Sequence, residues 1–410
     1  MVTIKKKPNI SFKEVLAYLF VFTCFFPYLA RPIGNTTGAQ VGELIAIIGL
    51  IIFFPHINKK ILNAFLLIWI PLVISCILNL LFNRAIDELV LIKSFLLITI
   101  IFFSFLFSGL IINRSNFKNI LYVASIAILI QSIFAAMQYY YFQKGIFPYQ
   151  SLFLTNPGLM SIANVARDYA IYNKRIFGWF PEPSAMAAAI GPWVVIIILI
   201  TSKYLNYKIL PLISSVCGIG LILVSASGYI LFLMISVFFI LGIFIIDFAK
   251  RKEKRKILFI SILFITLVLY ISWHGYGKHY KSRFIFNENP SWVWRYQSIL
   301  DGFNLLNNNF GNLLFGVGPG QSFLNLREKG PIISVMSNYL TETGIFGMIS
   351  SVVLFILILL RIIRGKAELK IPGLLCFLSW IGSVFFSTSY YDLLSVWVFL
   401  TILVLWNELF

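Results

Sequence analysis

The chain has 410 residues, of which 60% are hydrophobic and only 12% are charged, and its formal net charge is +18. A soluble domain carries about twice this share of charged residues, so the composition excludes an ordinary soluble protein. The charge alone is typical of a nucleic-acid-binding protein. However, most of the Lys and Arg residues lie between apolar segments, where they orient a membrane protein. We therefore expect no nucleic-acid partner, and a single transmembrane domain over residues 1–410.

Apolar runs recur along the whole chain with the length that a helix needs to cross a bilayer, roughly 17–25 residues. They are continuously apolar, unlike the alternating strands of a membrane β-barrel. The pattern predicts an all-α polytopic membrane protein with about twelve transmembrane helices. These helices are expected at residues 15–29, 41–54, 61–82, 89–112, 119–142, 185–202, 209–224, 229–248, 257–273, 339–360, 371–388 and 393–409.

The charges between these runs predict the orientation. Alternate loops are short and rich in Lys and Arg, the densest being residues 250–256, and such loops lie in the cytoplasm. Both termini are then cytoplasmic. Two long loops, residues 143–183 and about 274–338, lie on the outer face, which is the periplasm in a Gram-negative cell.

Cysteine and histidine indicate no metal or cofactor. The four cysteines fall within apolar runs, where they read as small packing residues. His274 and His279 lie five residues apart with no Cys or Asp nearby, which is a poor spacing for a metal site.

The first outer loop ends in the sequence GWFPEPS, from Gly178 to Ser184, directly before an apolar run. The two prolines flanking Glu182 restrict its backbone, and Ser184 falls where a helix N-cap is expected. A carboxylate held at the mouth of a helix bundle can act as a base or orient an arginine. Alternatively, Glu182 pairs with Arg175 or only sits at a favourable helix N-terminus.

The second outer loop contains a helical pattern. Trp292, Tyr296, Ile299 and Phe303 recur on one face, which places Arg295 on a short helix along the membrane surface. An interruption at residues 307–310 follows.

A glycine alternation comes next, at Gly316, Gly318 and Gly320. It lacks the strand–helix context of a dinucleotide fingerprint. It predicts a turn with close backbone approach, or a nest of amides for an oxyanion. Glu342 then lies inside or at the lip of the next span. An ionisable residue there is a functional candidate by default, and its alternative role is a structural ion pair.

The outer loops also hold arginines that the orientation rule would deplete. Long loops tolerate them during translocation. The competing interpretation is an anion site, because the arginine fork binds phosphate and pyrophosphate through two hydrogen bonds. The candidates are Arg175, Arg283, Arg295 and Arg327.

These motifs together resemble the bacterial O-antigen polymerases and ligases. The resemblance rests on the Phe-Pro-Glu-Pro-Ser element around Glu182 and on three elements of the late outer loop. Those are Arg295-Tyr-Gln-Ser, Phe-Gly-Val-Gly-Pro-Gly320 and Ser-Asn-Tyr-Leu-Thr-Glu342-Thr-Gly. It covers residues 175–347 by motif and the remainder by topology. It implies a fold similar to the class C (GT-C) membrane glycosyltransferases, and a location in the bacterial inner membrane.

The activity that this resemblance implies is metal-independent glycan transfer without a cofactor. An O-antigen polymerase joins repeat units carried on undecaprenyl pyrophosphate at the periplasmic face. Its partners are the lipid-linked donor and acceptor, membrane lipid and, as a further candidate, a chain-length regulator. Ser337 stands where the ligase branch carries a functional histidine, which favours a polymerase. A ligase acting on lipid A-core and a non-enzymatic polysaccharide-lipid flippase remain alternatives.

For this reaction the expected catalytic residues are Arg295, Glu182 and Glu342. Arg295 would stabilise the departing pyrophosphate, and either glutamate would serve as base or orient the attacking hydroxyl. The expected substrate-binding residues are Arg283, Arg175, Arg327, Gly316, Gly318, Gly320, Tyr339 and Trp179. The two aromatic rings are candidates for stacking on sugars, although Trp and Tyr are also common at membrane interfaces.

Overall fold

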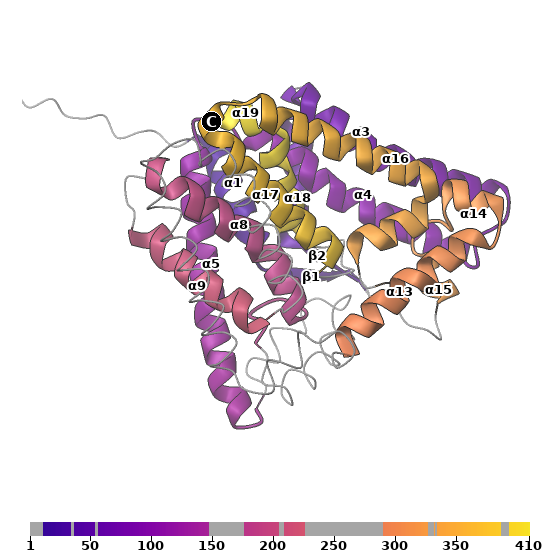
Figure 1. Ribbon diagram of the computed structural model, residues 1–410, viewed down its shortest axis with the longest axis horizontal. Coiled ribbons are helices and arrows are strands. Elements are labelled where there is room, and N and C mark those ends of the chain that lie inside the picture. The colour runs from indigo at the N-terminus through magenta and orange to yellow at the C-terminus, as the bar shows by residue number, and fades with distance from the viewer. Residues whose placement is uncertain are drawn as a thin grey trace, which may run out of the picture.

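The computed structural model describes residues 11–33, 37–53, 56–146, 176–204, 209–225, 290–326, 332, 334–386 and 393–410. Within these residues the chain is helical apart from one two-stranded hairpin (Figure 1). The hairpin pairs β1 (Ala30–Ile33) with β2 (Thr37–Gln40) in antiparallel fashion. It joins α1 (Phe12–Thr23) to α2 (Val41–Phe53), and the apolar pattern did not predict it.

Six of the described helices are long and apolar enough to cross a membrane. This confirms the prediction of an α-helical, multi-pass membrane protein, although the predicted total of about twelve spans is not tested. The spans predicted at residues 229–248 and 257–273 lie outside the described residues. The six helices are α3 (Lys59–Leu81), α4 (Glu88–Ile111), α5 (Phe117–Gln143), α8 (Pro183–Tyr204), α16 (Val335–Arg364) and α17 (Ala367–Phe386).

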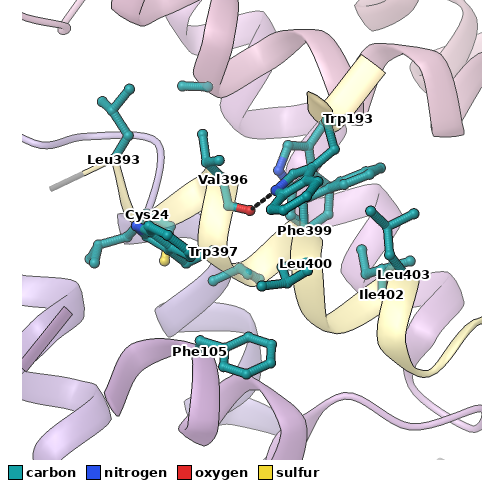
Figure 2. Close-up of a cluster of buried hydrophobic side chains, with 14 of the residues drawn as sticks. Cys24, Phe105, Trp193, Leu393, Val396, Trp397, Phe399, Leu400, Ile402 and Leu403 are labelled. Carbon is teal, nitrogen blue, oxygen red and sulfur yellow. Dashed lines mark hydrogen bonds between the residues drawn. The ribbon is translucent and has the colours of Figure 1, made fainter. Parts of the chain in front are cut away.

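The last predicted span is shorter than expected. In place of one helix over residues 393–409, the chain forms α18 (Leu394–Val404) and the short α19 (Trp406–Leu409). Every residue of α18 is buried, which is typical of a helix enclosed by other helices. Figure 2 shows its residues Trp397, Phe399 and Leu400 among side chains from other parts of the chain, including Trp193 of α8. The Trp193 indole donates a hydrogen bond to the Ser395 carbonyl across 3.1 Å.

The span predicted at residues 339–360 is also different, because α16 is bent. Gly344 has φ 64° and ψ −155°, which no α-helix contains. Val335 and Leu354 line the same internal cavity, yet in a straight helix they would be separated by roughly 28 Å. The helix therefore folds back at Gly344 into a hairpin with a short first arm, residues 335–343, and a long second arm, residues 345–364 (Figure 1).

Contacts with α3 show which way the first arm points. The Tyr339 hydroxyl donates to the Ile68 carbonyl in the middle of α3, and the Ser75 hydroxyl donates to the Glu342 carbonyl one to two turns further along. Because α3 is predicted to run from the cytoplasm outward, the first arm starts inside the bundle and rises toward the outer face. The second arm then returns to the other end.

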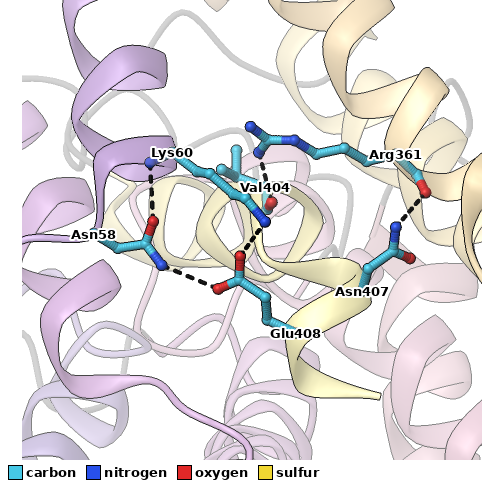
Figure 3. A network of polar contacts seen from close by, with 6 residues as sticks. All are labelled: Asn58, Lys60, Arg361, Val404, Asn407 and Glu408. Carbon is cyan, nitrogen blue, oxygen red and sulfur yellow. Dashed lines mark hydrogen bonds and ion pairs between the residues drawn. The ribbon is translucent and has the colours of Figure 1, made fainter.

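The opposite end of the bundle holds a polar network (Figure 3). Glu408 of α19 forms an ion pair with Lys60 at the start of α3 and accepts a hydrogen bond from Asn58. Arg361, near the end of α16, donates to the Val404 carbonyl, and Asn407 donates to the Arg361 carbonyl. This arrangement gathers the start of α3, the end of α16 and the C-terminal residues on one face, as the topology prediction requires.

Candidate functional site

The bend in α16 is the centre of the candidate site. A helix end leaves its last carbonyl groups without helical partners, and here other segments supply the donors. The Val317 amide donates to the Thr341 carbonyl across 3.0 Å, and the Gly318 amide donates to the Glu342 carbonyl across 3.2 Å. The Ser75 hydroxyl adds a second donor to Glu342 across 2.6 Å. The predicted glycine turn thus caps the first arm.

This cap depends on residues without side chains. Gly316, Gly318 and Gly320 all have positive φ, between 73° and 96°, where L-residues are strained. A Cβ on Gly316 would lie 2.2 Å from the Glu342 carbonyl carbon, and one on Gly344 would lie 2.6 Å from the Gly316 amide nitrogen. The backbones of the loop and of the bend are therefore in direct contact.

The Glu342 carboxylate lies inside this cap, with an exposed fraction of 1%. Its Oε1 accepts from the Gly320 amide at 2.8 Å and from Asn338 Nδ2 at 3.4 Å. The Ser322 hydroxyl lies 3.2 Å from the same oxygen and 2.7 Å from Asn338 Oδ1. The amides of Val317, Gly318 and Gly320 thus bind protein oxygens, and the anion at Gly320 is Glu342 itself.

The glycine turn is also held by the adjoining ends of α3 and α4. Asn79, one turn after Ser75 on α3, donates to the Gly316 carbonyl across 3.2 Å. Gln321, which begins α15 (Gln321–Asn325), accepts from the Ile86 amide at 2.8 Å and donates to the Asp87 carbonyl at 2.9 Å. The turn lies between the bend of α16 and the α3–α4 connection.

Arg295 lies on α13 (Pro290–Asn307), which confirms the predicted helix and its end. The helix packs against the first arm of α16 at Gly302, where a Cβ would come within 2.7 Å of the Thr341 hydroxyl. Arg295 is two turns before this contact. Its side chain is half-buried and its Nε atom is buried. Thr341 precedes Glu342, so α13 connects the arginine to the same bend.

A second part of the site is the segment before α8. Gln138 of α5 accepts from the Phe177 and Gly178 amides at 3.1 and 2.9 Å and donates to the Gly178 carbonyl at 2.7 Å. Gln131, two turns earlier, accepts from the Trp179 amide at 2.8 Å and donates to the Phe25 carbonyl at 2.6 Å. Two buried glutamines therefore fix this segment inside the bundle.

Trp179 packs between aromatic rings. Its ring stacks on Phe134 at a centroid distance of 4.7 Å and meets Phe26 edge-on at 5.3 Å. These contacts show a packing role for the indole, and its role in binding sugar stays a prediction.

Glu182 is the N-cap of α8, because its carbonyl accepts the first helical hydrogen bond, from the Met186 amide at 3.1 Å. Pro183 occupies the first helical position, which suits a residue without an amide hydrogen. The predicted N-cap at Ser184 is therefore wrong by two residues. The Ser184 hydroxyl instead donates to the Glu182 carboxylate, which is half-buried.

The segments that carry the two glutamates both contact α17. The Ser383 hydroxyl of α17 donates to the Ala188 carbonyl of α8, and Ser334, just before the first arm of α16, donates to the Val384 carbonyl. Glu182 precedes Ala188 by six residues, which places it roughly 9 Å along α8 from the contact with α17. Glu342 follows Ser334 by eight residues, which places it about 12 Å along the first arm from its contact with α17. Both carboxylates therefore lie toward the end of the bundle that is predicted to face outward.

Tyr339 is on the inner side of the hairpin. It is 4% exposed and its hydroxyl bonds to α3. With apolar residues of both arms it lines a small, almost wholly apolar cavity. The cavity is lined by Ile68, Phe102, Val335, Met336, Tyr339, Ser351, Leu354, Phe355, Trp380, Val384, Trp397 and Leu400.

Three predicted substrate-binding arginines, Arg175, Arg283 and Arg327, lie outside the described residues. The sequence reasoning also missed polar residues that build the site. A usable signal was present for the four of them on α3 and α5, since polar residues inside apolar spans mark helix–helix hydrogen bonds. The missed residues are Ser75, Asn79, Gln131, Gln138, Ser322 and Asn338.

These features define an α-helical, multi-pass membrane protein with a buried carboxylate at a broken helix. No protein-family model, curated protein or solved structure matches the chain.

Proposed function

We propose that this protein is an O-antigen polymerase, a metal-independent membrane glycosyltransferase with a GT-C-like fold. It joins oligosaccharide repeat units carried on undecaprenyl pyrophosphate at the periplasmic face of the bacterial inner membrane. The observation that supports this proposal best is the assembly at the bend of α16. There the glycine turn, Glu342 and the helix carrying Arg295 meet toward the predicted outer face.

In the proposed reaction, a sugar hydroxyl of the acceptor attacks the anomeric carbon of the donor glycan. The new glycosidic bond forms as the bond from that carbon to pyrophosphate breaks, and undecaprenyl pyrophosphate leaves with the electron pair. Negative charge grows on the leaving group, so a fixed cation stabilises the transition state more than the ground state. Arg295 is the proposed cation.

The hydroxyl proton needs an acceptor, and the two glutamates differ in their suitability. Oε1 of Glu342 is already occupied by protein donors and the side chain is almost wholly buried. The Glu182 side chain is more accessible, and its carboxylate accepts a hydrogen bond from the Ser184 hydroxyl. We assign Glu182 as the general base and Glu342 as a positioning residue that holds the glycine turn.

A transporter of lipid-linked glycan is the second candidate, because secondary transporters often contain broken helices near their binding sites. In those proteins the freed carbonyls coordinate an ion or substrate. Here Val317, Gly318 and Ser75 cap the freed carbonyls of Thr341 and Glu342, which favours the enzyme.

The lipopolysaccharide of a deletion strain separates these functions. Loss of a polymerase leaves core with a single repeat unit, whereas loss of a ligase leaves core without O-antigen. Loss of a flippase strands repeat units on the inner leaflet. We expect the first pattern, and either of the others would refute the proposal.

Complementation of that strain tests Arg295. Arg295→Lys keeps the charge but loses the planar fork, and losing such a donor costs about 10²–10³ in rate. We expect the ladder to collapse to one unit at normal protein abundance. Lys144→Ala, which removes an exposed cation at the end of α5, should restore the full ladder. A full ladder from Arg295→Lys would remove Arg295 from the mechanism.

A further inference from the structure

The α13 helix has an apolar face that is largely exposed. At about 100° per residue, Val293, Tyr296, Leu300 and Phe303 fall within an arc of about 80°. All four are exposed, Tyr296 at 55% and Phe303 at 52%. The opposite side of α13 is buried, with Ser298, Asp301 and Leu306. This face differs from the one predicted from the sequence, since Ile299 is only half-exposed.

The face has a polar border. Gln297 and Asn304 are exposed and lie next to the apolar arc, on the side away from Phe303. Three exposed asparagines, residues 307–309, end the helix. An apolar stripe beside a polar edge is the pattern of a helix that lies in a membrane interface.

The apolar face extends onto α14 (Phe310–Phe315), which follows α13. Phe310 is 74% exposed, and the Phe315 ring lies 6.1 Å from the ring of Phe346 on α16. Phe346 is the first residue of an exposed apolar stripe along the long second arm, which continues through Ile349, Val353, Ile356 and Leu360. Since that arm has the length and composition of a membrane span, the stripe faces lipid, and α14 adjoins it.

The outer end of α3 gives the depth of this region. Arg84, just after α3, lies against Gly311 of α14. A Cβ added to Gly311 would come within 1.7 Å of the Arg84 Nη1 atom. The same guanidinium lies 5.2 Å from the centroid of the exposed Phe82 ring. Arginine and aromatic residues of this kind anchor helices at the boundary between hydrocarbon and water.

We propose that the exposed face of α13, with Phe310 of α14, inserts into the outer leaflet of the lipid bilayer. The occupant of the face is lipid, because α14, which follows α13 directly, adjoins the lipid-facing stripe of α16 at Phe315 and the α3–α4 connection at Gly311. The helix then lies flat in the interface, with Gln297 and Asn304 toward water. This proposal is independent of the proposed enzymatic function.

Spin labels on the full chain test the insertion. Single cysteines replace Tyr296, Phe303, Gln297 or Asn304 in a chain whose Cys24, Cys76, Cys217 and Cys376 are changed to alanine. The labelled protein is reconstituted into vesicles of phosphatidylethanolamine and phosphatidylglycerol. Collision rates are measured with oxygen, which concentrates in lipid, and with a neutral nickel chelate, which stays in water. All four positions are exposed. Gln297 also donates to Asp301 on the buried side across 3.3 Å, so Asn304 is the principal reference position for water.

Insertion predicts a several-fold higher ratio of oxygen to nickel collisions at residues 296 and 303 than at residues 297 and 304. Equal access to nickel at all four positions would show that the face lies in water and would overturn the proposal. Low access to both reagents at residues 296 and 303 would overturn it too, since it would indicate a covering protein or a second copy of the chain. A label at Leu300 provides a repeat within the same arc.

Discussion

Gly344 and Gly316 determine the position of Glu342 because their backbones lie closer together than side chains would allow. The bend at Gly344 frees the carbonyls of Thr341 and Glu342, and the turn that starts at Gly316 caps them. At the scale of single residues, the site therefore depends as much on missing side chains as on the carboxylate.

Substitution of Gly344 by alanine tests this dependence. The residue would be forced into a positive φ, which costs about 1–3 kcal/mol, and its Cβ would lie 2.6 Å from the Gly316 amide nitrogen. We expect a clear fall in the melting temperature of the purified protein in detergent. Gly220→Ala is the control, because nothing lies within 4 Å of that Cβ and alanine favours a helix. Equal melting temperatures for the two variants would contradict the tight contact.

Different substitutions of the two glutamates distinguish a base from a positioning residue. Glu342→Gln keeps an oxygen that can accept from the Gly320 amide, so we expect the fold and most of the polymerisation rate to persist. Glu342→Leu removes the acceptor and leaves buried donors unsatisfied, at a cost of about 1–3 kcal/mol each. Glu182→Gln should lose about 10²–10⁴ in rate, the usual contribution of a general base, while the protein stays folded.

The measurement is the polymerisation rate with purified lipid-linked repeat units, together with protein abundance. Glu88→Gln, at the exposed start of α4, is the control for loss of an outer carboxylate. An inactive but stable Glu342→Gln protein, with an active Glu182→Gln protein, would reverse the two assigned roles.

At the scale of elements, the site is assembled by segments that interrupt regular helices. The first arm of α16 begins inside the bundle, α13 packs on it, and the segment before α8 is fixed by Gln131 and Gln138. If α13 lies in the outer leaflet, its packed side carries Arg295 at the depth of lipid headgroups, where a prenyl-linked pyrophosphate would lie.

Gln138→Leu tests how the segment before α8 is held. The change removes one donor and one acceptor and leaves the Phe177 and Gly178 amides and the Gly178 carbonyl without these bonds. At about 1–3 kcal/mol for each buried polar group, we expect a large fall in melting temperature and loss of polymerisation. Tyr139→Leu changes the exposed neighbouring residue and should alter neither. Normal stability of Gln138→Leu would show that the segment is held by its aromatic contacts instead.

At the scale of the whole molecule, the two ends of the bundle differ in character. One end gathers Lys60, Arg361 and Glu408, and the other holds the glycine turn and the α3–α4 connection. The density of Lys and Arg in the loops predicts that the first end is cytoplasmic, which places the candidate site on the outer face.

Reporter fusions check this orientation. Alkaline phosphatase fused after Asn309 should be active, because it folds only outside the cytoplasm. Fusions after Arg114 or after the last residue, Phe410, should be inactive. The reverse pattern would place Glu342 and Arg295 on the cytoplasmic face and exclude a reaction with donors on the outer leaflet.

The sequence alone predicted the membrane class, most helix positions, the glycine turn and the place of Glu342 at the edge of a span. It could do so because apolar length, loop charge and an acid in an apolar run are local signals. It also located α13 and its end at Asn307.

Only the tertiary structure showed that α16 doubles back at Gly344, and that the turn amides bind protein carbonyls. Hydropathy reports how apolar a segment is but not its direction, so two arms of a hairpin resemble one long helix. Likewise, Ser75 and Asn79 form hydrogen bonds with residues that lie 267 and 237 positions away in the sequence. The partner of Gln138 lies 40 positions away. Such pairings depend on how the chain packs, because each polar group inside a bilayer must find its partner within the protein.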